Sequence, residues 1–199
     1  MLSDKSILQE MEAGNIVIEP FDIRSLGTNS YDVRLGEWFV FPRMRLSYTG
    51  SGFLAPQPIN FWKESDAKRF WNEPVQEKKE LTIYPGETVL AVTEEVVGGT
   101  NGITTSMRAR SSIVRSCLAV AKCGGLGDVG YISKWTMEIS NFSHSTLIIP
   151  VGMRVAQMEF FRVGETIKEY SGKYGSRTNW TPQDMLPKLY KDRELNVSN

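Results

Sequence analysis

Residues 108–142, RARSSIVRSCLAVAKCGGLGDVGYISKWTMEISNF, join a basic segment to a glycine-rich turn and a β-patterned run. Two guanidinium groups and two hydroxyls fall within six positions of this stretch, a density of hydrogen-bond donors that suits a polyphosphate. These donors belong to Arg110, Ser111, Ser112 and Arg115. Beyond the turn, Glu138 stands in the β-patterned run, where a carboxylate facing a bound nucleotide is a candidate general base. The stretch therefore predicts strands around a nucleotide site.

Each of these features also has an ordinary interpretation. The basic segment fits a solvated strand end, and the turn GGLGDVGY (124–131) fits either a close approach to a ligand or a plain hairpin loop. Strand alternation puts Thr136, Glu138 and Ser140 on one face and the apolar residues between them on the other. Because a strand glutamate usually faces solvent, the residues alone leave the role of Glu138 open.

Composition limits the classes of function. The chain has 199 residues, in which 23 basic side chains balance 23 acidic ones, so no overall field attracts a nucleic-acid polymer or an acidic membrane. Residues 1–15 lack the basic start and apolar block of a signal peptide, and no apolar run approaches the roughly 20 residues that cross a bilayer. We expect a cytoplasmic protein.

Zinc ligands are scarce in the sequence. The single histidine, His144, and the two cysteines, Cys117 and Cys123, do not form the His and Cys-x-x-Cys set of zinc-dependent base deaminases. No zinc site is predicted, and we expect the cysteines to be small core residues or site linings. Walker and Rossmann fingerprints are also absent, so phosphate binding requires another segment.

The remaining pattern is mainly β, in one domain over residues 1–199. A helix is expected at 4–13, with Ser3 as its N-cap and Gly14 at its end. Strands are expected at 16–18, 31–35, 38–41, 88–97, 103–108, 135–141, 147–149 and 155–161, a pattern typical of a sandwich or barrel. Residues 43–80 form an elaboration with a short helix at 65–71, and the polar arm from 168 wraps a neighbour or closes over a ligand.

Several segments together resemble the dCTP deaminase family, a branch of the trimeric dUTPase-like superfamily. They are RSSIVR (110–115), GDVGY (127–131), WTMEISN (135–141), GMRVAQMEFF (152–161) and GKYGSRTN (172–179), with LSDKSILQEMEAGNIVIEPF (2–21), GTNSYDVRLG (27–36) and YPGETVLAVTEE (84–95). The resemblance leaves out only about 43–80 and the last fifteen residues. It implies a distorted, jelly-roll-like β-barrel of the β-clip type.

The resemblance also implies an activity, the hydrolytic deamination of dCTP to dUTP and ammonia without zinc, which breaks the C–N bond of a cyclic amidine. Glu138 would shuttle the proton, supported by Ser111 and Arg115. Triphosphate contacts would come from Arg110, Ser111, Ser112, Gln157, Tyr170, Lys173 and Arg177. Asp128 would receive the sugar 3′-hydroxyl, and Thr136, Met137 and Glu138 would read the base. Mg²⁺ would accompany the triphosphate, dTTP would inhibit by feedback, and a homotrimer would hold its sites between subunits beneath the arms.

Three departures from the family pattern bear on these roles. Cys123 and Gly124 replace a Thr-Ala pair whose alanine carbonyl helps to hold the catalytic water, so this role passes to Gly124. Arg177 stands where many members have Gln and offers a stronger, charge-assisted phosphate contact. Ser133 replaces the glycine before the catalytic strand.

Three other functions stay open. The first is a bifunctional deaminase and dUTPase that releases dUMP and pyrophosphate, which Gly125 at the turn favours. The second is a pure dUTPase, for which Gly125, Asp128 and Tyr131 supply the G-x-x-D-x-x-Y pattern without needing Glu138. The third is a nucleotide sensor on the same trimer that performs no chemistry.

Overall fold

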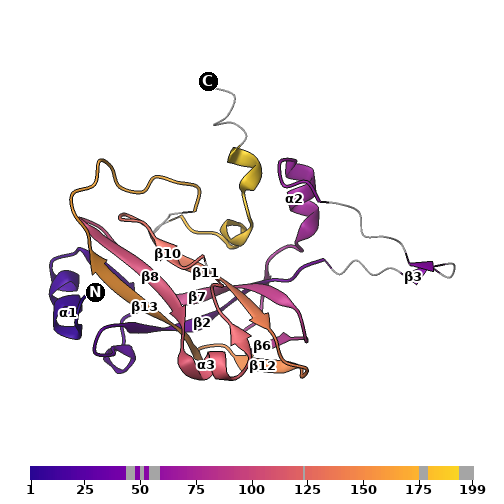
Figure 1. The fold of residues 1–199 in the computed structure, drawn as a ribbon, viewed down its shortest axis with the longest axis horizontal. Helices are drawn as coiled ribbons and strands as arrows, with labels where there is room; N and C mark the ends of the chain where they lie inside the picture. The colour runs from indigo at the N-terminus through magenta and orange to yellow at the C-terminus, as the bar shows by residue number, and fades with distance from the viewer. Residues whose placement is uncertain (44–47, 50–51, 54–58, 123, 175–178, 193–199) are drawn as a thin grey trace.

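The computed structural model describes residues 1–43, 48–49, 52–53, 59–122, 124–174 and 179–192 (Figure 1). Its strands are β1 (Ile16–Glu19), β2 (Tyr31–Val40), β3 (Tyr48–Thr49), β4 (Gly52–Phe53), β5 (Val75–Gln76), β6 (Glu80–Ile83), β7 (Thr88–Gly99), β8 (Ile103–Ala109), β9 (Leu118–Ala119), β10 (Leu126–Gly127), β11 (Ile132–Asn141), β12 (Leu147–Pro150) and β13 (Arg154–Arg162). Its helices are α1 (Asp4–Glu12), α2 (Glu64–Phe70) and α3 (Ser111–Arg115), with 3₁₀ turns η1 (Ile23–Ser25), η2 (Pro182–Met185) and η3 (Leu189–Lys191). The mainly β prediction is confirmed.

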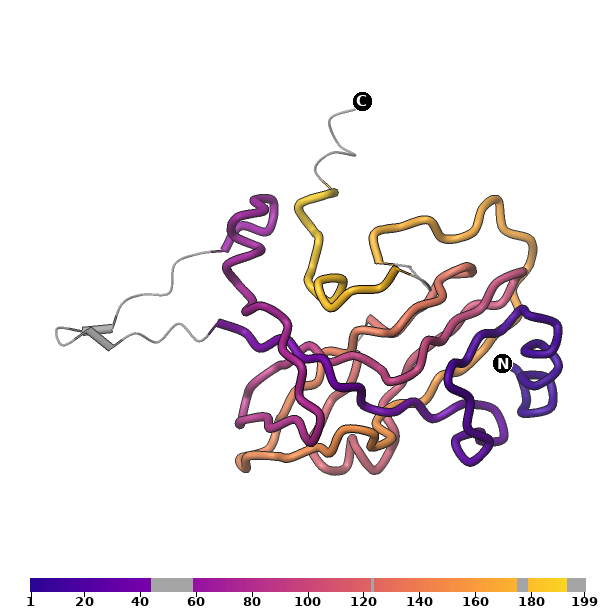
Figure 2. The backbone as a smooth tube through the Cα atoms, turned by 180° about the vertical axis from the view of Figure 1, so that it is seen from behind, coloured from indigo at the N-terminus to yellow at the C-terminus, as the bar shows by residue number. Residues whose placement is uncertain are grey.

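A curled antiparallel sheet forms the body of the molecule, with the order β10-β8-β13-β2-β7-β11-β9. Strands β1 and β5 add to it by pairing with β7 and β2, and β12 pairs with β6 in a separate ribbon. In Figure 1, α1 lies at one end of the sheet, whereas the C-terminal tail and α2 lie on the side of β10 and β11. Figure 2 shows the same arrangement from behind. The sheet thus carries the β-patterned run and the tail on one side.

The core has two parts that follow the alternation of the strands. The larger cluster lies within the curled sheet and includes Tyr31, Phe39, Met137 and Phe160, all fully buried. A smaller cluster packs Trp71 and Met185 against Val40, Leu90 and Val92. Because Trp71 follows α2 and Met185 belongs to the tail, this cluster fixes both segments to the same patch of sheet.

The N-terminal helix agrees with its sequence signals. Ser3 caps it by accepting a hydrogen bond from the Ser6 amide at 3.3 Å. The helix ends at Glu12, and Gly14 follows with φ +76°, a left-handed conformation that favours glycine. The short helix expected at 65–71 is also confirmed, as α2 at 64–70.

Some local expectations were wrong. The two strands expected at 31–35 and 38–41 are one strand, β2, whose pairing with β7 shifts register between Leu35 and Phe39. Within it, a Cβ added at Gly36 would lie 2.9 Å from Val92, so the close approach of β7 requires glycine. Cys117 is a free, exposed thiol and not a core residue, and Cys123 lies outside the described residues. No helix in the described ranges has the length and apolar character needed to cross a membrane.

Candidate active site

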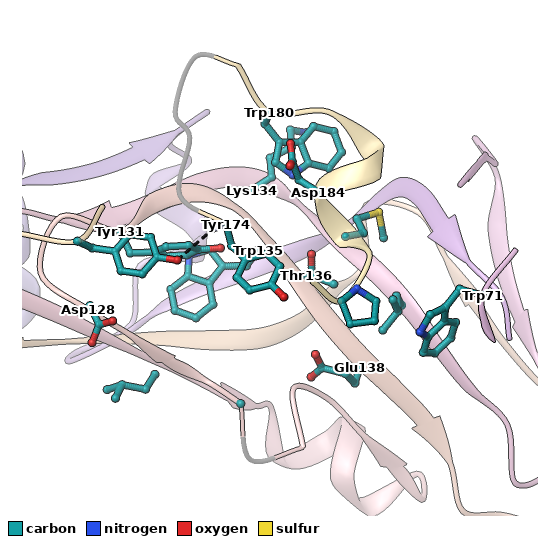
Figure 3. A pocket seen from close by; sticks show the side chains of 16 residues that line it. Trp71, Asp128, Tyr131, Lys134, Trp135, Thr136, Glu138, Tyr174, Trp180 and Asp184 are labelled. Atoms are coloured by element: carbon teal, nitrogen blue, oxygen red, sulfur yellow. Dashed lines mark hydrogen bonds between the residues drawn. The ribbon is translucent and has the colours of Figure 1, made fainter. Parts of the chain in front are cut away.

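A cavity of about 430 Å³ lies between β11, the glycine-rich turn and the C-terminal tail (Figure 3). We call it the Glu138 cavity. Its aromatic lining consists of Trp71, Tyr131, Trp135, Tyr170, Tyr174 and Trp180. Its charged lining consists of Asp128, Lys134, Glu138 and Asp184. A space of this size with apolar walls and few charged groups is typical of a small-molecule site.

Glu138 reaches the cavity because β11 alternates its side chains. Met137 is fully buried in the core, whereas Thr136 and Glu138 line the cavity on the opposite face. Burial raises the pKa of Glu138, and its own backbone amide and the Lys122 ammonium only partly oppose that rise. A partly desolvated carboxylate with a raised pKa is suited to accept and return a proton near neutral pH.

The glycine-rich turn lies directly against the sheet. A Cβ added at Gly127 would lie 2.3 Å from Thr105 Oγ1 and 2.6 Å from the Trp135 ring, so only glycine fits there. At the other end of the turn, a Cβ added at Gly124 would lie 3.9 Å from Glu138 Oε2. The backbone of Gly124, to which the resemblance assigns the water-holding carbonyl, therefore lies beside the Glu138 carboxylate.

Asp128 is an exposed residue of the turn and also lines the cavity. Figure 3 shows its carboxylate and that of Glu138 at separate places along the cavity. The Tyr131 amide donates to the Asp128 carbonyl at 2.9 Å, which closes the turn between them. Asp128, Tyr131 and Glu138 are thus brought together, as several of the predicted roles require.

The aromatic wall is held rigidly. The ring of Tyr131 makes edge contacts with Trp135 and Tyr170, at centroid distances of 5.1 and 5.3 Å. The Trp135 indole N–H donates to the Val97 carbonyl at 2.9 Å, which leaves no free polar group on that ring. Burial raises the pKa of Tyr131 to about 12, so its hydroxyl stays protonated. The wall offers flat surfaces suited to a base or sugar.

The C-terminal tail covers the cavity of its own chain. Met185 is buried in the smaller core cluster, and the Trp180 ring lies 5.9 Å from the Lys134 ammonium, within the range of a cation–π contact. Asp184 accepts hydrogen bonds from the Lys188 ammonium at 2.6 Å and the Thr181 amide at 2.9 Å. Burial works against ionisation of Asp184, but these bonds prevail and lower its pKa.

The basic segment occupies a different part of the surface. Strand β8 ends at Ala109 and the chain turns into α3, so Ser111, Ser112 and Arg115 are exposed. The guanidinium of Arg110 forms an ion pair with Asp32 at 3.0 Å. We call the following set the Arg110 cluster: Arg110, Ser111, Ser112, Arg115 and Gln157, with the neighbouring Asp32 and Arg154. Among the described residues that line the Glu138 cavity, none belongs to this cluster.

Polar contacts hold the Arg110 cluster together. Arg154 lies 3.5 Å from the Asp32 carboxylate, and the Arg110 guanidinium donates to the Arg154 carbonyl at 3.2 Å. Gln157, opposite Asp32 in the β13–β2 register, donates to Ser30 Oγ at 3.3 Å. Asp32 alone faces two guanidinium groups, so the cluster keeps a positive charge available for an anion.

Three further predicted phosphate ligands belong to the tail: Tyr170, Lys173 and Arg177. Lys173 forms an ion pair with Asp192 and does not line the cavity, whereas Tyr170 does. Arg177 lies outside the described residues. Met137 was predicted to read the base. Its side chain is fully buried in the core, and its backbone pairs with Ala91 of β7, so the side chain does not face the cavity.

Sequence reasoning missed several lining residues. Lys134 precedes the run used for strand alternation, yet it lies on the same face of β11 as Thr136 and Glu138. Trp180, Asp184 and Met185 lie in a segment without strand or helix periodicity. A signal did exist there: Thr181 and Asp184 have the spacing of a capping box, which marks a turn that begins at Pro182.

The chain matches known proteins over most of its length. The family model described as dCTP deaminase-like matches residues 1–163. A protein of Haloarcula marismortui named dCTP deaminase is 29% identical over 199 residues, covering 98% of this chain and 97% of that protein. A protein of Nocardioides sp. named dCTP deaminase, dUMP-forming, is 32% identical over 180 residues, covering 89% and 88%.

A solved structure also shares the fold. The 2′-deoxycytidine 5′-triphosphate deaminase from Agrobacterium tumefaciens superposes with a TM-score of 0.58 at 18% sequence identity. The match covers 82% of this chain and 47% of that chain, so this chain spans about half the length of that protein. At this identity the likeness concerns the fold.

Proposed function

The chain belongs to the dCTP deaminase-like family, and on that premise we propose that it deaminates dCTP by hydrolysis, releasing dUTP and ammonia. One observation carries the proposal: Glu138, with a raised pKa, stands in an aromatic cavity beside the Gly124 backbone. A desolvated carboxylate next to oriented backbone groups is what deamination needs when no cation activates the water.

In the proposed reaction, Glu138 takes a proton from a water molecule whose oxygen adds to C4 of cytosine. Glu138 then gives this proton to the ring nitrogen N3. A second proton passes from the new C4 hydroxyl to the amino group. The amino group then leaves as ammonia, and the C4 carbonyl of uracil forms. The Gly124 carbonyl holds the water, Thr136 and the β11 backbone read the base, and Asp128 receives the 3′-hydroxyl.

The triphosphate is assigned to the Arg110 cluster of a second copy of the chain. This cluster does not line the Glu138 cavity of its own chain, so a homotrimer with sites between subunits would supply both parts. Tyr170, Lys173 and Arg177 of the tail would then close over the phosphates, with Ser111 and Arg115 supporting the chemistry. Lys173 would exchange its Asp192 partner for phosphate oxygens.

We propose Mg²⁺ as a companion of the triphosphate. Within the described ranges, no group of three His, Cys, Asp or Glu side chains has the arrangement of a metal site. Mg²⁺ commonly keeps several waters and binds through substrate phosphates, so the Arg110 cluster needs no metal cage of its own. A cytoplasmic location and feedback inhibition by dTTP complete the proposal.

A second candidate function is dCTP deaminase with dUMP formation. Asp128 and Glu138 line one cavity, and several relatives, including the Nocardioides protein, carry the dUMP-forming name. In that case Asp128 would activate water for attack on the phosphate chain, and pyrophosphate would leave. Gly125, Asp128 and Tyr131 also match the G-x-x-D-x-x-Y pattern of a pure dUTPase, so that function stays an alternative.

One assay separates these functions. The purified chain is incubated with dCTP or dUTP and magnesium, and ammonia, dUTP, dUMP and pyrophosphate are measured together. Ammonia matched by dUTP supports the proposal, and ammonia matched by dUMP and pyrophosphate supports the bifunctional enzyme. Pyrophosphate from dUTP with no ammonia from dCTP identifies a dUTPase, and nucleotide binding without any product identifies a sensor.

A mixing experiment tests the shared site. Glu138→Gln and Arg115→Met proteins, each expected to be inactive, are co-expressed in equal amounts with different tags and co-purified. If each site takes Glu138 from one subunit and Arg115 from the next, every mixed trimer that carries both tags has one complete site in three and regains about a third of wild-type activity. A site contained within one chain recovers nothing.

A further inference from the structure

The segment just before Gly124 has a strained backbone. Ala121 and Lys122 are consecutive non-glycine residues with φ of +59° and +35°, a left-handed conformation that side chains disfavour. The Gly124 amide donates to the Ala121 carbonyl at 2.8 Å, so the strained pair forms the turn that presents Gly124. Strain of this kind persists only where surrounding contacts hold it.

The side chain of Lys122 supplies such a contact. Its ammonium donates to Thr88 Oγ1 at 3.2 Å, and Thr88 and Ser140 share a hydroxyl hydrogen bond of 2.7 Å. Ser140 follows Glu138 by two positions on β11 and so lies on the same face. Lys122 therefore ties the strained turn to the face of the sheet that carries Glu138. The buried Ala121 side chain holds the other end of the turn.

Lys122 also places a positive charge near the Glu138 carboxylate. Across the β11–β7 register Glu138 faces Leu90, which carries no charge. The other ionisable groups that face the cavity are Asp128 of the turn, Lys134 of β11, Asp184 of the tail, and Tyr131, Tyr170 and Tyr174. The Lys122 ammonium lowers the pKa of Glu138, in opposition to burial.

We propose that Lys122 is a positioning residue for the deamination: its ammonium, bonded to Thr88, holds the left-handed pair Ala121 and Lys122 so that the Gly124 backbone and the Glu138 carboxylate stay side by side. This inference rests on the proposed function, because Gly124 and Glu138 are the groups assigned there to the attacking water. It adds a residue to which neither composition nor the resemblance gives a role.

Three variants separate the tether from the charge. Lys122→Met removes both, and Lys122→Arg keeps the charge and a donor. Thr88→Val keeps the charge and removes the acceptor, together with the Thr88–Ser140 hydrogen bond. Lys78→Met, at an exposed position, is the matched control. We expect kcat for dCTP deamination to fall roughly 10- to 100-fold in Lys122→Met with KM little changed, as for a misplaced reacting group. Thr88→Val is expected to lower kcat less, and Lys122→Arg to restore most of it.

The pH profile distinguishes this role from a structural one. Without the ammonium, only the backbone amide of Glu138 opposes the effect of burial, so the pKa of Glu138 rises further and the acidic limb of kcat/KM moves to higher pH in Lys122→Met. Lys122→Arg and Thr88→Val should keep the wild-type limb. Unchanged thermal unfolding of each variant controls for folding. Wild-type kcat and an unmoved limb in Lys122→Met would overturn the inference.

A second readout is independent of turnover. Carboxyl-carbon NMR of Glu138 in the full-length protein follows its titration directly, with Glu138→Gln to assign the signal. An upward shift of its pKa in Lys122→Met supports the inference, and an unmoved titration overturns it while ammonia release by the wild type leaves the deaminase proposal intact. If the wild type releases no ammonia from dCTP, the proposed function fails, and the positioning role in deamination fails with it.

Discussion

The Glu138 cavity and the Arg110 cluster contain similar polar groups in opposite surroundings. The cavity is walled by aromatic rings and covered by the tail, and burial alters the pKa values of Glu138 and Tyr131. The cluster has exposed members on α3 and part-buried members on β2 and β13, and Arg110 forms an ion pair with Asp32. Charges act more strongly in the partly desolvated cavity, whereas solvent and salt screen the exposed charges of the cluster. Chemistry is therefore expected in the cavity, and capture of a charged ligand at the cluster.

The sharpest test of this division is Glu138→Gln. The amide cannot shuttle a proton, so we expect ammonia release from dCTP to fall by roughly 10²–10⁴-fold. Binding of dCTP, measured by calorimetry, should stay within a few-fold of wild type because the shape of the cavity is kept. Glu77→Gln, at an exposed position, is the control. Comparable activity in the two variants would contradict the assignment.

Arg110→Met tests the other side. Losing a charge-assisted hydrogen bond costs about 1.5–3 kcal/mol, so affinity for dCTP should fall by roughly 10- to 100-fold. Affinity for deoxycytidine, which lacks phosphates, should not change. Calorimetry with both ligands at two salt concentrations provides the measurement, with Arg162→Met as the control at the far end of β13. Equal losses for both ligands would show that the two regions are not divided as proposed.

Met185→Ala tests whether the tail is held by its own chain. Truncating this buried side chain removes the tail from its contact with Trp71 and the sheet, at a cost of at least about 2 kcal/mol. We expect faster hydrogen exchange at the amides of Asp184 and Leu186, with exchange in the sheet unchanged. Leu189→Ala, at a half-exposed position, should have little effect. Unchanged tail exchange would mean that other contacts hold it.

The smallest expected effect concerns stability and pH. Burial raises the folded pKa of Glu138 above its ordinary value of 4.5, so between the two values the folded state binds more protons than the unfolded state. Stability contributed by the neutral carboxyl is present below pH 4.5 and is lost as pH rises through the folded pKa. Glu138→Gln should therefore match wild type in acid and unfold at a slightly higher temperature at pH 7, as measured by calorimetric scans. The opposite sign would place Glu138 in water.

Much of the fold was legible in the sequence because local signals agreed with the tertiary structure. Ser3 and Gly14 mark the two ends of α1. The alternation of β11 places Met137 in the core and Glu138 on the cavity side. The glycines of the turn are explained by contacts as short as those at Gly127. The caps of α1 and the alternation of β11 depend on neighbours close along the chain, where propensity and spacing act directly.

The rest of the site depends on contacts between distant segments. No pattern in the sequence near Met185 predicts its packing in the same cluster as Trp71, because the two residues are far apart in the chain and meet only in the folded core. The five-residue helix α3 was not expected either, since its Ile and Val favour strands. The role of Lys122 could not be predicted from the sequence, because it depends on a left-handed backbone and on a hydrogen bond to Thr88, which is distant in the chain.

The aromatic wall has an optical consequence. Trp71, Trp135 and Trp180, three of the five tryptophans, line one cavity, whereas Trp62 is 49% exposed to water elsewhere. A pyrimidine that stacks among those indoles changes their emission, and water around Trp62 gives a separate, red-shifted component. The protein thus contains its own fluorescent reporter, through which occupancy of the cavity can be followed in stopped flow without a label.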